Sequence, residues 1–173
     1  TEYATLPDAG DVPLVVDLSS NIGSRPMPLE QIGLSYAGAQ KNLGPSGVTL
    51  VFVREDLLER TPIGHVPTML RYGTHVAKNS LFNTPNTFGI LVLRNVLRWM
   101  KGQGGVAAIG AVNEAKAGSL YAALDESSLF VPHAQAGSRS TMNVTWTLAG
   151  SDDAQKDART KAFLAAAAEA GFS

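Results

Sequence analysis

Residues 35–47 read Ser-Tyr-Ala-Gly-Ala-Gln-Lys-Asn-Leu-Gly-Pro-Ser-Gly, with Lys41 at the centre. Small residues precede this lysine and a glycine-rich turn follows it, so bulky neighbours are absent on both sides and a ligand has room. Residues 48–53 then form a continuous apolar, β-branched run with the length of a buried strand. The sequence therefore predicts that Lys41 lies where a strand meets a turn, from which a rigid scaffold can present a side chain to a cavity.

A second stretch, residues 14–17 (Leu-Val-Val-Asp), is an apolar run that ends in the carboxylate of Asp17. In an open α/β sheet, ligands bind outside the carboxyl ends of the strands. Most lysines beside turns are ordinary surface residues. A desolvated lysine, however, can form a Schiff base with a carbonyl cofactor, and pyridoxal phosphate also needs a carboxylate beside its ring nitrogen. Lys41 and Asp17 are the two protein groups that this cofactor needs most.

These stretches belong to a longer series of motifs. The series comprises residues 15–20 (Val-Val-Asp-Leu-Ser-Ser), 24–26 (Ser-Arg-Pro), 36–47, 82–85 (Phe-Asn-Thr-Pro), 99–105 and 138–144. On these residues, and in this order, the chain resembles the phosphoserine aminotransferase family over nearly its whole length. That family consists of class V, fold-type I pyridoxal-phosphate transaminases of serine biosynthesis. One local departure is Asn86, where the family commonly has a second proline, and we expect it to alter loop stiffness more than chemistry.

The resemblance implies a role for five residues. Lys41 would be the catalytic residue that bonds pyridoxal 5'-phosphate as a Schiff base, and Asp17 would pair with the pyridinium nitrogen. Gln40 would contact the cofactor phosphate. Asn83 and Thr84 would reach across a dimer interface to the phosphate of the partner's cofactor. No metal-binding residue is predicted.

The resemblance also implies a reaction and partners. The reaction is reversible amino transfer, in which glutamate and 3-phosphooxypyruvate give 2-oxoglutarate and O-phosphoserine. The enzyme would be a homodimer with shared active sites. Some relatives also use 4-phosphohydroxythreonine in pyridoxine biosynthesis, and the sequence leaves open whether this chain does so.

Composition narrows the alternatives. The 173 residues carry 14 basic and 15 acidic side chains and a net charge of -1, so no electrostatic footprint for nucleic acid or an anionic membrane exists. The absence of cysteine excludes disulfides and thiolate zinc sites, and the three histidines lack metal-ligand spacing. No apolar run approaches the roughly 20 residues of a membrane span, and a signal peptide with charged and then apolar residues is not expected. A cytoplasmic location is expected.

The predicted fold class is α/β: part of a fold-type I large domain followed by the start of a small α/β domain. Residues 1–101 are expected to be the second half of the cofactor-binding large domain. Residues 102–173 are expected to be a long linking helix and the beginning of the small C-terminal domain. By resemblance the chain is expected to be a fragment that lacks the ring-stacking aromatic residue, the phosphate cup and the C-terminal substrate residues. The chain alone is therefore expected to bind the cofactor weakly and to show no turnover.

The patterns predict these elements. Strands are expected at 14–17, 34–37, 48–53 and 139–148. A helix is expected to start at 54–60, and three further helices at 87–101, 106–124 and 152–170. The segment 61–86 is expected to be turn-rich and the segment 125–135 irregular. Thr84 or Thr87 is the expected N-cap of the helix at 87–101, and Trp99 is expected in the core.

Two other classes of function stay open. One is another class V pyridoxal-phosphate enzyme, of the desulfurase or kynureninase-like kind. Gln40 stands where those enzymes commonly have a histidine, which argues against this interpretation. The other is a non-catalytic, truncated module that only dimerises.

Overall fold

The computed structural model describes residues 1–60 and 64–172. The chain divides into two compact units. We call Leu6–Ala111 the lysine unit, and Thr1–Thr5 together with Val112–Ser173 the hairpin unit. The assignment of residues 1–101 and 102–173 to two domains of a larger enzyme stays a prediction. Among the described residues, no helix combines the length and the apolar character that crossing a membrane requires.

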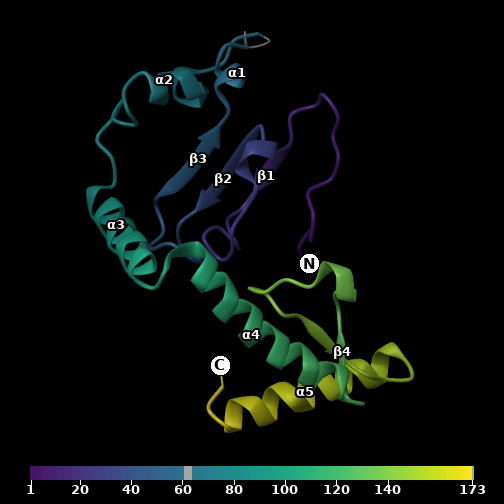
Figure 1. Cartoon of the computed structure of the whole chain (residues 1–173). Helices are drawn as coiled ribbons and strands as arrows, with labels where there is room; N and C mark the ends of the chain where they lie inside the picture. The colour runs from purple at the N-terminus through teal and green to yellow at the C-terminus, as the bar shows by residue number, and fades with distance from the viewer. Residues whose placement is uncertain (61–63, 173) are drawn as a thin grey trace. The chain divides into compact units, whose positions relative to one another are not determined.

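The lysine unit contains a three-stranded mixed sheet (Figure 1). Its elements are β1 (Val15–Asp17), β2 (Leu34–Gly38), β3 (Thr49–Val53), the short helices α1 (Glu55–Leu58) and α2 (Tyr72–Val76), the long helix α3 (Thr87–Gly102), and 3-10 turns at Leu29–Gln31 and Thr68–Leu70. The strands and α3 are confirmed to within one residue at each end. The turn-rich segment holds α2 and a 3-10 turn from residue 64 onward, and residues 61–63 lie outside the described residues.

Strand β2 is central in this sheet. It runs parallel to β1, with Asp17 opposite Tyr36, and antiparallel to β3, with Gly38 opposite Thr49. The carboxyl ends of β1 and β2 therefore meet at the same edge of the sheet. Since residues 39–48 connect β2 to the start of β3, the segment that carries Lys41 also lies at this edge.

The core of the lysine unit covers one face of the sheet. Ala37 and Ala39 are completely buried, and their small side chains leave room for the side chains of α3 to pack close to β2. The buried core consists of Leu18, Ile22, Ala37, Ala39, Leu43 and Met100, with Leu93 and Val96 of α3 packed against it. Residues on both sides of Lys41 are thus held in the core, which leaves the lysine on a supported segment.

The N-terminus of α3 differs from the expectation. Asn86, and not Thr84 or Thr87, is the N-cap, because its side-chain oxygen accepts a hydrogen bond from Gly89 N at 3.0 Å. Its amide nitrogen lies 3.5 Å from the carbonyl oxygen of Gly47, in the turn that follows Lys41. Asparagine at position 86, where the resembled family commonly has proline, therefore provides a helix-capping group. The sequence analysis predicted only a change in loop stiffness at this position.

Replacing Asn86 by alanine is expected to destabilise the lysine unit by about 1 kcal/mol, because Gly89 N would lose its partner. The free energy of unfolding in urea measures this effect. Asn95→Ala, an exposed position within α3, is the matched control and is expected to leave stability unchanged or slightly raised, since alanine favours helix. Equal losses in the two variants would contradict the capping role.

Helix α3 also corrects the expectation for Trp99. This side chain is 57% exposed, whereas the next residue, Met100, is buried. Side chains at successive helical positions point about 100° apart, so Met100 packs in the core while its neighbour Trp99 points away from it. Ile90, Leu91 and Leu97 are exposed as well, so only part of the apolar pattern of this helix forms core.

The hairpin unit is built on a second, two-stranded sheet. Its elements are α4 (Gly105–Asp125), which begins in the lysine unit, β4 (Phe130–Pro132), a 3-10 turn (Ala136–Ser138), β5 (Trp146–Leu148) and α5 (Asp153–Glu169). β4 and β5 pair antiparallel, and the ring of Phe130 packs in T-shaped arrangements with the rings of Trp146 and Phe163. Asp152 caps α5 by accepting a hydrogen bond from Gln155 N.

Two expectations for this unit were wrong. The segment 125–135 was expected to be irregular but contains β4, and only residues 146–148 of the predicted strand 139–148 are a strand. The Ser140 hydroxyl accepts hydrogen bonds from Met142 N and Asn143 N, which bends the backbone that the apolar alternation would have extended.

Candidate functional site

Asp17 is the last residue of β1 and its carboxylate is exposed at the edge of the sheet. The backbone N–H of Ser19 donates to Asp17 Oδ1 at 2.8 Å. Hydrogen bonds from the Ser19 side chain and backbone lower the pKa of Asp17 most. Burial raises this pKa by less than Ser19 lowers it, and the Tyr36 hydroxyl and the charge of Lys41 lower it slightly further. The group is therefore a carboxylate anion at neutral pH.

Lys41 lies at the top of a helical turn that follows β2. Leu43 N and Gly44 N both donate to the carbonyl oxygen of Ala39 at 2.9 Å, and Ala39 N donates to Val48 O at 2.9 Å. Ala39 and Leu43 are buried while Lys41 is exposed between them. The buried residues on either side of Lys41 thus fix its backbone, while the lysine side chain stays exposed.

The neighbours of Lys41 in the turn are also positioned. Asn42 donates from its side-chain amide to Ile22 O at 2.7 Å, which fixes the turn to the loop that follows β1. The Gln40 side chain folds over Gly38, since a Cβ built on Gly38 would come within 2.4 Å of Gln40 Oε1. Gly38 therefore needs to lack a side chain in this conformation of Gln40.

The structure brings together three of the five predicted site residues. Asp17, Gln40 and Lys41 lie at one edge of the sheet, where the charge of Lys41 acts on the Asp17 carboxylate. Asn83 and Thr84 lie between α2 and α3, and the Asn83 amide donates to Thr84 O at 3.1 Å. Within residues 1–60 and 64–172, neither makes a hydrogen bond or ion pair to the other three.

The sequence analysis missed two residues of the site. Ser19 donates its backbone N–H to the Asp17 carboxylate, and the hydroxyl of Tyr36 lowers the pKa of Asp17. Ser19 lies in the Asp-Leu-Ser-Ser motif, so the motif was a signal for it, although the motif does not say which serine turns toward the carboxylate. Tyr36 is found only from the register of β1 with β2, which places it opposite Asp17.

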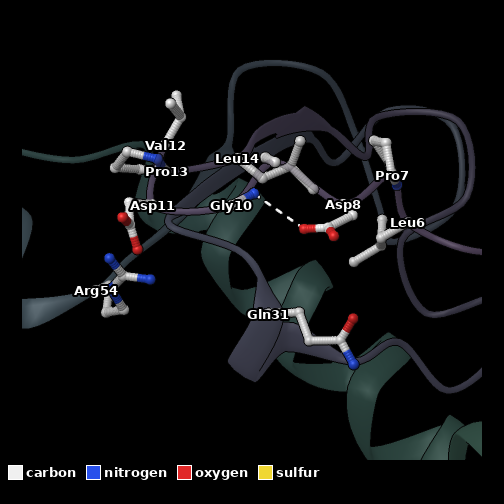
Figure 2. A pocket seen from close by; sticks show the side chains of 11 residues that line it. Leu6, Pro7, Asp8, Gly10, Asp11, Val12, Pro13, Leu14, Gln31 and Arg54 are labelled. Carbon is white, nitrogen blue, oxygen red and sulfur yellow. Dashed lines mark hydrogen bonds between the residues drawn. The ribbon is translucent and has the colours of Figure 1, made fainter.

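A cavity of about 540 Å³ lies elsewhere in the lysine unit, and Figure 2 shows the side chains that line it. Its walls come from residues 6–14, Gln31 and Arg54. Asp8 accepts a hydrogen bond from Gly10 N at 3.0 Å, and Arg54 pairs with Asp56. Neither Asp17 nor Lys41 lines this cavity, so the chemistry of the site lies at an exposed edge of the sheet.

Known proteins resemble this chain over nearly its whole length. The family model described as aminotransferase class-V matches residues 4–162. The chain is 51% identical over 173 residues to the phosphoserine aminotransferase of Halalkalibacterium halodurans and 55% identical to that of Geobacillus kaustophilus. Each alignment covers 99% of this chain and 46% of the relative, so the chain spans about half the length of the curated relatives it matches.

Solved structures give the same result. A phosphoserine aminotransferase from Bacillus circulans subsp. alkalophilus is 47% identical with a TM-score of 0.88, covering 98% of this chain and 45% of that chain. A pyridoxal-phosphate-bound phosphoserine aminotransferase from Trichomonas vaginalis is 36% identical with a TM-score of 0.82, covering 92% of this chain and 44% of that chain. The chain belongs to the class-V aminotransferase family.

Proposed function

We propose that this chain is part of a pyridoxal-phosphate-dependent phosphoserine transaminase that acts in the cytoplasm. Glutamate would give its amino group to 3-phosphooxypyruvate, which forms O-phosphoserine and 2-oxoglutarate. The position of the ionised Asp17 and of the turn that carries the exposed Lys41 at the same edge of the sheet carries this proposal. The relatives at 51% and 55% identity favour it over the desulfurase or kynureninase-like alternative.

Pyridoxal phosphate suits the residues at this edge of the sheet. An aldehyde needs an accessible amine, which Lys41 provides, and a protonated ring nitrogen needs an anionic partner, which Asp17 provides. When bound, the cofactor supplies an electron sink for the bonds at the substrate's α-carbon. The hydrogen bonds from Ser19 and Tyr36 keep Asp17 ionised and thus able to hold that ring charge.

The other site residues have roles in the same proposal. The Lys41 Nζ would bond the cofactor carbonyl and then accept and return the proton of the substrate's α-carbon. The Gln40 amide would donate to the cofactor phosphate. Asn83 and Thr84, which lie away from Asp17 along the chain, would serve the phosphate bound by the partner in a homodimer. Residues 1–101 would belong to the large domain and 102–173 to the linking helix and the small domain.

The test is reductive trapping. The chain is incubated with pyridoxal phosphate, its visible absorption spectrum is recorded, borohydride is added, and the labelled peptides are mapped. Preferential labelling of Lys41 over the exposed Lys116 is expected, with weak affinity, because these 173 residues correspond to 46% of the length of the relative. Equal labelling of the two lysines would contradict the site.

The reaction itself is tested in the protein as the cell makes it. O-phosphoserine with 2-oxoglutarate is expected to yield glutamate, and alanine in place of O-phosphoserine is the control substrate. If Lys41 is labelled but no glutamate forms from O-phosphoserine, the cofactor assignment stands and the substrate assignment is wrong. If neither is seen, the non-catalytic dimerising module is the remaining interpretation.

A further inference from the structure

Ser19 lies between the Asp17 carboxylate and the carboxyl end of β2. Its backbone N–H donates to Asp17 Oδ1 at 2.8 Å, and its hydroxyl oxygen accepts a hydrogen bond from Gly38 N at 3.1 Å. The same hydroxyl is the group that lowers the pKa of the Asp17 carboxyl most. A hydroxyl has one proton to donate and lone pairs to accept with, so both contacts can be made at once. Ser19 thus connects two strand ends through one side chain.

The backbone around Ser19 is held in place independently of this side chain. Leu18 N donates to Tyr36 O at 2.8 Å, which continues the pairing of β1 with β2 by one step. The Leu18 side chain is buried in the core, and its carbonyl oxygen accepts from Ile22 N at 2.8 Å. Removing the Ser19 hydroxyl therefore leaves the local backbone supported, so its effect on the site can be separated from an effect on folding.

On the other side, Gly38 leads directly into the turn that carries Lys41. It is the last residue of β2, and the next residue, Ala39, accepts the two hydrogen bonds that close the turn. The Gln40 side chain lies against Gly38. The Ser19 hydroxyl therefore binds the backbone at Gly38, directly before the turn that carries Gln40 and Lys41.

We propose that Ser19 is a positioning residue, which ties the Asp17 carboxylate to the start of the lysine turn and so sets how the two groups face one cofactor. Its relevance to the cofactor rests on the proposed function, whereas the tie itself does not. A serine two residues after an aspartate often serves only a local turn. The contact with Gly38, 19 positions along the chain, distinguishes the two roles because a local turn does not reach it.

The decisive measurement needs no cofactor. The carboxyl group of Asp17 is titrated by carbon NMR in the wild-type chain and in Ser19→Ala. The variant is expected to raise the Asp17 pKa, because the largest stabilisation of the charged form is removed. The titratable groups that act on Asp17 from the neighbouring β2 and lysine turn, Tyr36 and Lys41, are unchanged in the variant.

Three further variants sharpen the comparison. Ser19→Thr keeps the hydroxyl and is expected to restore the wild-type titration, whereas Ser19→Val has the same shape without it and is expected to behave like Ser19→Ala. This pair decides the question if the alanine variant does not fold. Ser20→Ala, a change of the adjacent serine, is the matched control and is expected to leave the titration unchanged.

A second readout follows the lysine turn. In Ser19→Ala the Gly38 amide is expected to exchange its hydrogen faster, and trapping of pyridoxal phosphate on Lys41 is expected to slow by roughly threefold to tenfold. An Asp17 titration that is the same with and without the hydroxyl at position 19 overturns the proposal. A shifted titration in a chain whose wild type does not label Lys41 supports the tie and contradicts the proposed function instead.

Discussion

Lys41→Ala is expected to abolish the preferential trapping of pyridoxal phosphate and the visible absorption of the complex. The amine of Lys41 is exposed at the same edge of the sheet as the ionised Asp17, and alanine has no group that can bond an aldehyde. Transaminase activity of the protein as the cell makes it is expected to fall by more than a factor of roughly 1,000, because both the covalent bond and the proton carrier are lost. Peptide mapping after borohydride reduction and a glutamate assay measure the two effects.

Two variants control this experiment. Lys116→Ala removes an exposed lysine of α4 and is expected to keep both the trapping on Lys41 and the activity. Lys41→Arg keeps a positive charge but has no amine that forms a Schiff base, so it is expected to behave like Lys41→Ala. Residual trapping in Lys41→Ala at the wild-type level would show that another lysine carries the cofactor.

Leu43→Ala is expected to destabilise the lysine unit by about 2–5 kcal/mol, since Leu43 is only 2% exposed and lies in the core with Ala39 and Met100. Its N–H also closes the turn that presents Lys41. The cavity left by the shortened side chain loosens the flank of this turn, so weaker trapping on Lys41 is expected together with the lower stability. Urea unfolding and reductive trapping measure the two effects.

Leu91→Ala is the matched control because it removes the same atoms from a side chain of α3 that is 47% exposed. Its expected cost is below about 1 kcal/mol, since little apolar surface returns to water. A similar loss of stability in the two variants would mean that burial of Leu43 does not support the turn.

Local sequence signals predicted much of the site. An apolar run that ends in an aspartate placed Asp17 at a strand end, and small residues around Lys41 indicated a supported turn. Both signals work because burial and backbone conformation restrict the residue types that fit. Ser19 was missed because the partner of a hydroxyl group depends on the direction in which the hydroxyl points. For Ser19 one partner is the backbone N–H of Gly38 in the neighbouring strand, 19 positions further along the chain.

In the fold, too, local patterns predicted the elements, whereas details that depend on side-chain direction were not predicted. The helix at 87–101 was predicted from its apolar pattern, but its cap at Asn86 and the exposure of Trp99 were not. The strand at 146–148 was predicted too long, because the hydroxyl of Ser140 binds two backbone amides and interrupts an alternating pattern that apolar spacing alone favours. The roles of Asn83 and Thr84 stay predictions.

The sequence by itself determined the family and predicted the lysine and the aspartate, because the proposed covalent chemistry and ring charge would require those residue types whatever surrounds them. Only the tertiary structure decided that β1 runs parallel and β3 antiparallel to β2, which brings Asp17 and the lysine turn to one edge of the sheet. It also decided which hydroxyls reach the Asp17 carboxylate and hold it ionised. Strand pairing joins residues distant in the chain, and hydrogen bonds depend on the resulting directions and distances, which no local pattern of residues specifies.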